Sequence, residues 1–173
     1  MSNQRRRAGC LVLLLTIISV GCEVQPPDLT TANKEVVRQF FVALDAQDYD
    51  ALTGLMHEAF VIPARVIDGA ERSVGRDATF ELIRGFYRSF PDYTHDIEEI
   101  IAEGDRVAVR VVLRGTHLGE YKGVAPTGRQ VKYAGTYMGT VIDGVLTEVW
   151  SLDDEINLFL QLGMELTPSS DGN

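Results

Sequence analysis

The spacing of apolar residues changes at Pro91, and this change restricts the folds that the chain can adopt. Before Pro91, apolar residues recur at every third or fourth position, which is the period of an amphipathic helix. After Pro91 they alternate with polar residues, which is the period of a strand. Helices followed by a long antiparallel sheet predict an α+β fold.

The first part contains three expected helices. One begins near Asn33, and the others span Tyr49–His57 and Ala78–Phe90. Thr31 and Asp48 precede the first two helices, at positions where a side-chain oxygen can cap exposed backbone amides.

The second part predicts four strands and a closing helix. The expected strands are Thr94–Glu103, Arg106–Arg114, Arg129–Ile142 and Val145–Asp153, and the helix is Glu155–Leu162. Asp143 and Gly144 form a strong hairpin-turn signal between the last two strands. Gly135 and Gly139 fit a sharp bend of the third strand, or they mark bulges. A sheet that bends in this way can close over a helix and leave a cone-shaped pocket.

The strand Arg106–Arg114 has two distinct faces. One face carries Val107, Val109, Val111 and Leu113, and the other carries the arginines. Arg110, on the polar face, could bind an anionic ligand group through two hydrogen bonds. Alternatively, the arginines pair with acidic residues on a solvated or subunit-facing surface.

Residues 1–21 have the pattern of a signal peptide. Three arginines precede the 13 apolar residues Ala8–Val20, a run shorter than the ~20 residues that span a bilayer as a helix. The segment Ser19–Cys22 resembles the bacterial lipobox, whose cysteine is acylated and becomes the mature N-terminus. A lipoprotein of the bacterial cell envelope is therefore expected, with its domain facing the periplasm or the exterior. Ordinary secretion and an uncleaved anchor are the alternatives.

The same reading divides the rest of the chain. Residues 22–32 are expected to form an extended tether, residues 33–163 one domain, and residues 164–173 a flexible tail. The thiol of Cys22 would be acylated, and Cys10 would be removed when the signal peptide is cleaved. No free thiol would then remain for catalysis.

The net charge of −9 argues against a nucleic-acid partner, which requires a basic surface. Cleavage would remove three arginines and leave 13 basic against 25 acidic residues, a charge of −12. Membrane contact is therefore expected through the N-terminal lipid only. The three scattered histidines predict no metal site, because none forms a helical pair.

Several short motifs follow one another along residues 33–163. They are Asn33–Phe41, Phe90–Asp92, Ala102–Arg110, Gly115–Glu120, Pro126–Val131, Asp143–Gly144, Glu148–Asp154 and Leu162–Gly163. In this order they resemble the SnoaL-like polyketide cyclase or ester cyclase family, within the nuclear transport factor 2-like superfamily. The resemblance implies a cone-shaped α+β barrel with helices packed on a curved antiparallel sheet.

The resemblance also implies a chemistry. Family cyclases close a ring by intramolecular aldol condensation on a polyketide methyl ester, without a metal or a cofactor. A carboxylate deep in the pocket removes a proton next to a carbonyl, and the matching position here is Asp154. The implied ligand is a small hydrophobic carbonyl compound. Because family relatives often associate through the sheet, a homo-oligomer is also expected by resemblance.

Strand alternation supports a role for Asp154, because it places Trp150, Leu152 and Asp154 on one face. Asp153 should then point the other way, into solvent. A carboxylate beside an indole in an apolar pocket should have a raised pKa, which suits a general base. The alternative is that Asp154 only caps the helix that begins at Glu155. If the Asp154 carboxylate caps that helix and faces solvent, the enzymatic hypothesis should be dropped.

Histidines offer weaker candidates. His117 lies in a turn after a strand and could polarise a substrate carbonyl near the pocket mouth. Alternatively, its ring bonds the loop backbone and fixes the turn. His57 and His95 are expected to be surface residues or to have their hydrogen bonds satisfied within the fold.

The remaining ligand-binding candidates are aromatic. The expected apolar wall consists of Phe40, Phe41, Phe86, Tyr87 and Trp150. Tyr133 and Tyr137 share a face and could donate hydrogen bonds into the cavity, or they only pack in the core. Many family members have Tyr where Phe41 stands, and His shortly after the second helix, where this chain has Phe60–Ala64. A pocket without these groups has fewer donors for an enolate.

Three functions remain open at this point. The first is aldol-type cyclisation with Asp154 as base, and the second is a non-catalytic ligand-binding or interaction module on a membrane-anchored lipoprotein. The third is isomerase chemistry like that of ketosteroid isomerase, a fold relative.

Overall fold

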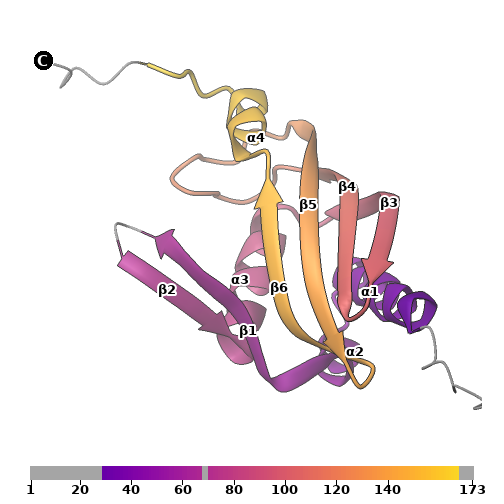
Figure 1. The fold of residues 1–173 in the computed structure, drawn as a ribbon. Coiled ribbons are helices and arrows are strands. Elements are labelled where there is room, and N and C mark those ends of the chain that lie inside the picture. Colours follow the sequence, from indigo (N-terminus) through magenta and orange to yellow (C-terminus); the bar gives the residue numbers. More distant parts are fainter. Residues whose placement is uncertain (1–28, 68–69, 168–173) are drawn as a thin grey trace, which may run out of the picture.

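The computed structural model describes residues 29–67 and 70–167 (Figure 1). The signal peptide, Cys22 and most of the tether lie outside these residues. The helices are α1 Thr30–Asp45, α2 Tyr49–Leu55, α3 Arg76–Ser89 and α4 Glu155–Leu162. The strands are β1 Met56–Ile67, β2 Ala70–Gly75, β3 Thr94–Glu103, β4 Arg106–Thr116, β5 Gln130–Ile142 and β6 Val145–Asp153. None of the helices in the described residues is long and apolar enough to cross a membrane.

The six strands form one curved sheet in the order β2-β1-β6-β5-β4-β3. Neighbouring strands run antiparallel, except that β1 and β6 are parallel. The helices α1, α2 and α3 lie on one side of the sheet, and α4 follows the end of β6 (Figure 1). This is the expected cone-shaped α+β fold.

The inner face of the sheet supplies the core. The alternation expected for Arg106–Arg114 is confirmed, because the four apolar side chains of β4 are at most 2% exposed. The arginines lie on the outer face, where Arg114 Nε is 2.5 Å from Asp96 Oδ2. Burying an apolar side chain stabilises the fold by about 1.5–3 kcal/mol, which makes this strand a main contributor.

Helix boundaries differ from the expected ones at four ends, one of which is the start of the third helix at Arg76 instead of Ala78. The first helix begins at Thr30 rather than Asn33, and no side chain caps it. The second ends at Leu55, so His57 belongs to β1. The third ends at Ser89 instead of Phe90. The expected cap at Asp48 is confirmed, because its carboxylate accepts a hydrogen bond from Ala51 N at 2.9 Å.

Two strands, β1 and β2, were not expected from the sequence. Strand β1 contains Pro63, which lacks a backbone donor. It pairs with β6 only through Met56 and Val61, and the register shifts between them. The segment therefore lacks the regular alternation by which the other strands are found.

Candidate functional site

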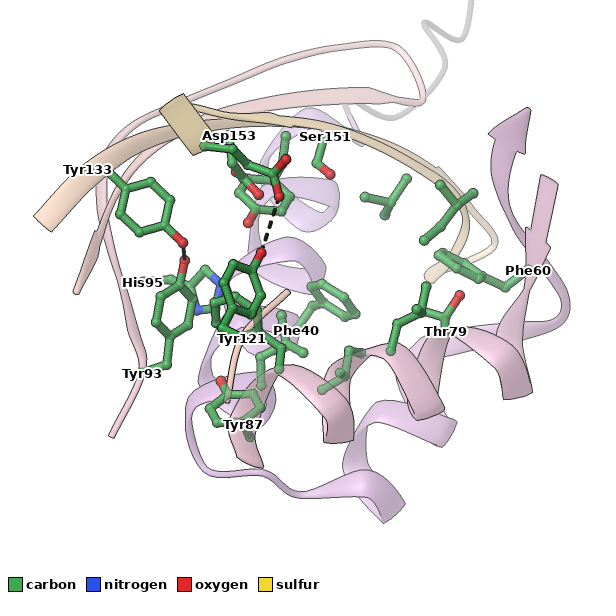
Figure 2. Close-up of a pocket in the computed structure, with 18 residues that line it drawn as sticks. Phe40, Phe60, Thr79, Tyr87, Tyr93, His95, Tyr121, Tyr133, Ser151 and Asp153 are labelled. Atoms are coloured by element: carbon green, nitrogen blue, oxygen red, sulfur yellow. Dashed lines mark hydrogen bonds between the residues drawn. The ribbon is translucent and has the colours of Figure 1, made fainter. Parts of the chain in front are cut away.

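A cavity of about 340 Å³ lies between the inner face of the sheet and helices α1 and α3, close to the lower size limit of known ligand sites. Eight lining residues are apolar: Phe40, Leu44, Phe60, Ile62, Leu82, Ile83, Phe86 and Val149. Five are tyrosines, Tyr87, Tyr93, Tyr121, Tyr133 and Tyr137, and the other five are Thr79, His95, Ser151, Asp153 and Glu155. Figure 2 shows Asp153 and Ser151 at one end of the cavity, with His95, Tyr93 and Tyr133 together on one side.

Asp153 supplies a carboxylate to this cavity. It is the last residue of β6 and shares a face with Ser151 and Val149, which also line the cavity. The Tyr137 hydroxyl on β5 forms a hydrogen bond with the Asp153 carboxylate. The carboxylate is therefore held against the sheet by a donor from the neighbouring strand.

Gly135 makes room for this carboxylate. It pairs with Asp153 across β5 and β6. A Cβ atom at Gly135 would lie 2.5 Å from Asp153 Oδ1 and 2.9 Å from Leu113 Cδ1. The expected bend at Gly135 therefore coincides with a position where no larger residue fits beside Asp153.

The expectation that Asp154 points into the pocket is wrong. Its carboxylate accepts a hydrogen bond from Asn157 N at 3.1 Å and caps α4, and the residue is exposed. The Asp154 side chain lies in a shallow groove with Leu152 and Ile156, outside the cavity. The capping alternative is therefore the observed one, and Asp154 is not a candidate base.

A β-bulge explains this difference. Next to the hairpin turn, Ile142 pairs with Val145 and Val141 with Leu146. Farther from the turn, between Thr140 and Gly135, the pairing with β6 is shifted by one residue. Without the shift, Tyr137 would pair with Trp150, whereas it pairs with Ser151. The shift brings the face of β6 that ends at Asp153 to the inside, and Trp150 pairs with the exposed Met138 on the outer face.

Trp150 and Arg110 accordingly lie outside the cavity. Arg110 forms ion pairs with Glu98 and Glu99 on the outer face, the latter with Nε and Oε2 3.6 Å apart. The acid-pairing alternative for Arg110 is therefore the observed one. Neither residue can contact a ligand in the cavity.

His117 also lies outside the cavity, because its ring holds the loop between β4 and β5. The side chain is 0% exposed and stacks on Phe90, with ring centroids 5.1 Å apart. Nδ1 accepts a hydrogen bond from Thr127 N at 3.3 Å, and the His117 backbone N–H donates to Arg129 O at 2.9 Å. The role of fixing the turn is therefore the one observed.

The aromatic candidates divide into two groups. Phe86, Tyr87 and Tyr137 line the cavity as expected. Phe41 stands behind the lining, with its ring centroid 5.1 Å from that of His95 and 5.2 Å from that of Tyr137. It supports the wall without forming its surface.

The cavity is also lined by His95, which forms a pair with Asp45 that was not expected as a site. His95 Nδ1 lies 2.6 Å from Asp45 Oδ1, and the His95 side chain is only 6% exposed. His95 pairs with Leu113, an inner-face residue of β4, only because the register of β3 and β4 shifts between Ile97 and Glu99. A regular hairpin would place His95 opposite Arg114 on the outer face, so strand alternation alone does not reveal this site.

The tyrosines provide hydroxyl donors at the cavity wall. Burial raises the pKa of Tyr87, Tyr93, Tyr121, Tyr133 and Tyr137 well above the ordinary value of about 10. They therefore stay protonated at neutral pH. The hydroxyls of Tyr93 and Tyr133 bond each other at 2.6 Å, and the Tyr121 hydroxyl donates to Glu155 at 3.2 Å (Figure 2).

Comparison with known proteins identifies the family. The sequence model of SnoaL-like polyketide cyclases matches residues 35–162. This chain belongs to the SnoaL-like polyketide cyclase family. No protein among the curated ones matches the chain.

Solved structures agree with this membership. IdmH, a proposed polyketide cyclase of Streptomyces antibioticus, is 31% identical, with a TM-score of 0.68 over 76% of this chain and 99% of that one. AclR, a proposed hydroxylase of Streptomyces galilaeus, is 26% identical, with a TM-score of 0.71 over 80% and 86%. A SnoaL-like protein of Jannaschia sp. shares the fold at 23% identity, with a TM-score of 0.71 over 82% and 99%.

Proposed function

We propose that this SnoaL-like protein binds a small hydrophobic carbonyl compound in the cavity and catalyses an aldol-type cyclisation with Asp153 as general base. The observation that carries the proposal is the Asp153 carboxylate within a cavity lined mainly by apolar and aromatic side chains. Family membership supports ring closure as the class of reaction. The role of general base, which was expected for Asp154, is therefore proposed for Asp153.

The proposed step begins with proton transfer from a carbon next to the substrate carbonyl to the Asp153 carboxylate. The resulting enolate carbon attacks a second carbonyl in the same molecule and forms the ring bond. Negative charge then develops on the attacked oxygen, where a hydrogen-bond donor lowers the barrier. Tyr87 lines the cavity, and its buried hydroxyl has no hydrogen-bond partner among the described residues, so we propose it as this donor once a substrate oxygen reaches it.

The surroundings suit a base that works in an apolar ligand site. Phe40 and Phe86 restrict water around the substrate, and Tyr137 fixes the orientation of the Asp153 carboxylate. A positioned general base typically contributes 10²–10⁴-fold to a rate. Ring closure itself gains from the cavity because the folded substrate is held close to its reactive geometry.

The test uses a panel of linear aryl poly-β-ketone methyl esters. Products are separated by chromatography and identified by mass spectrometry and proton NMR. The proposal expects a ring-closed isomer, or the same ring minus one water, formed faster with protein than without it. Binding of panel members without any ring closure would instead support the non-catalytic binding module.

A further inference from the structure

Asp45 and His95 come from distant parts of the chain and meet at the cavity wall. Asp45 is the last residue of α1, and His95 is the second residue of β3. The Asp45 carboxylate bonds His95 twice, through Oδ1 to the ring Nδ1 at 2.6 Å and through Oδ2 to the backbone N–H at 3.2 Å. Two contacts to one carboxylate fix the side chain relative to its own backbone.

Aromatic rings enclose the His95 imidazole on several sides. Its centroid lies 5.1 Å from that of Phe41, 5.1 Å from that of Tyr93 and 6.0 Å from that of Tyr137. The ring is therefore held in one orientation, with Nδ1 toward Asp45. Because His95 lines the cavity and its Nδ1 bonds Asp45, Nε2 is the ring nitrogen left for a ligand.

The pair lies close to the proposed base. Tyr137 stands between them, because its ring contacts His95 and its hydroxyl bonds Asp153. One ligand in a cavity of about 340 Å³ can therefore face both His95 and Asp153. A carboxylate bonded to Nδ1 fixes the tautomer of an imidazole and stabilises its protonated form.

We propose that His95, oriented by Asp45, is a second proton-transfer group of this cavity. This inference rests on the proposed function. When Asp153 removes the proton from carbon, the C–H electron pair forms the new carbon–carbon bond. The π electrons of the attacked carbonyl move to its oxygen, which receives the proton from Nε2 of protonated His95. Transfer of the proton from Asp153 to His95 through solvent restores both groups, so the cyclisation consumes no other reactant.

The test measures oxyanion binding and needs no turnover. The probe is para-nitrophenol, whose visible absorbance separates the bound phenolate from the phenol. The protein carries Asp153→Asn, whose amide replaces the carboxylate by a neutral group of the same size. The expected result is phenolate binding at a pH where the free probe is largely neutral.

Two further substitutions in this background test the pair. His95→Gln should weaken phenolate binding at least ~10-fold, the size of one lost hydrogen bond to a charged group. Asp45→Asn should weaken it several-fold, because the ring remains but its protonated form loses support. The control is His57→Gln, since His57 is exposed on β1 and outside the cavity. Phenolate binding that is equal in all four proteins would overturn the proposal.

A second measurement separates orientation from folding. Nitrogen-15 NMR of the otherwise unsubstituted protein should show the His95 proton on Nδ1 in the neutral ring, and Asp45→Asn should remove this preference while circular dichroism stays unchanged. A neutral His95 with its proton on Nε2 would overturn the role of Asp45.

The two proposals fail differently. No binding of para-nitrophenol in either form would overturn both, because the cavity would then be closed to ligands. If His95→Gln leaves phenolate binding unchanged while ring closure still requires Asp153, only the proposed role of His95 would be overturned.

Discussion

The space beside Gly135 decides whether a carboxylate can occupy this end of the cavity. A methyl group there would lie 2.5 Å from Asp153 Oδ1, too close for any ordinary contact. Asp153 belongs to the neighbouring strand, so a substitution at Gly135 changes the position of the Asp153 carboxylate and leaves the residue itself in place.

Gly135→Ala should therefore slow proton abstraction by Asp153 and lower the free energy of unfolding only moderately. We expect at least a ~10-fold slower reaction, because small displacements of a reacting group are costly. The free energy of unfolding should fall by about 1–3 kcal/mol from overpacking. Cyclisation rates and urea unfolding measure the two effects.

The matched control is Gly54→Ala in α2, where an added Cβ has no atom within 4 Å. It should leave the rate unchanged and raise the free energy of unfolding by about 0.5–1 kcal/mol, because alanine favours the helix. A Gly135→Ala protein with the original rate would show that the Asp153 position is not critical.

At the scale of elements, the sequence predicted regular segments and missed irregular ones. The bounds of β3, β6 and α4 are as expected. The Asp143-Gly144 turn before β6 has the positive φ angles of 51° and 80° that its residue types favour. Strands β1 and β2 could not be found, because neither has a regular local pattern: β1 pairs with the distant β6, and the edge strand β2 pairs only with β1.

The site was predictable to the level of the strand but not of the residue. The sequence placed an acid at the end of the last strand, and the family resemblance selected Asp154. The β-bulge after Thr140 reverses which face of β6 points inward, and no residue pattern signals it. His95 was missed for the same reason, because the register of β3 against β4 shifts between Ile97 and Glu99 and turns His95 inward.

The loop between β4 and β5 carries its own prediction. His117 is buried and bonded to the loop backbone, so His117→Ala should lower the free energy of unfolding by about 2–3 kcal/mol. Chemical denaturation measures this. The substitution His57→Ala, at an exposed position, should change the free energy of unfolding by less than about 0.5 kcal/mol. Equal effects of the two substitutions would contradict the structural role of His117.

At the scale of the whole molecule, the buried tyrosines link stability to pH. Their pKa values are raised in the folded protein relative to the ordinary value of about 10. Between these two values the folded protein holds protons that the unfolded chain has lost. Stability should therefore be complete below about pH 10 and fall as the pH rises further.

Urea unfolding across the alkaline range measures this effect. The free energy of unfolding should decline steadily above about pH 10, and tyrosinate absorbance should appear together with unfolding. Tyrosinate absorbance that rises fully in a folded protein would contradict the burial of these hydroxyls.

We also propose that the whole protein is held at the cell envelope through lipid on Cys22, since Ser19–Cys22 resembles a lipobox. In bacterial cells, Cys22→Ser should abolish incorporation of labelled fatty acid and release the protein from the membrane fraction. A protein that stays in the membrane fraction without label would indicate an uncleaved anchor instead.

The central claim is that the Asp153 carboxylate, and not the carboxylate of Asp154, removes a proton from a substrate carbon. Deuterium exchange into the methyl group of acetophenone, followed by proton NMR, tests it without knowledge of the natural substrate. Asparagine replaces either carboxylate at the same size, and it caps a helix as well as aspartate does, so Asp154→Asn is a matched control. We predict that Asp153→Asn slows protein-dependent exchange at least ~100-fold and that Asp154→Asn leaves it unchanged. Equal exchange by the two variants, or loss only in Asp154→Asn, would contradict the account.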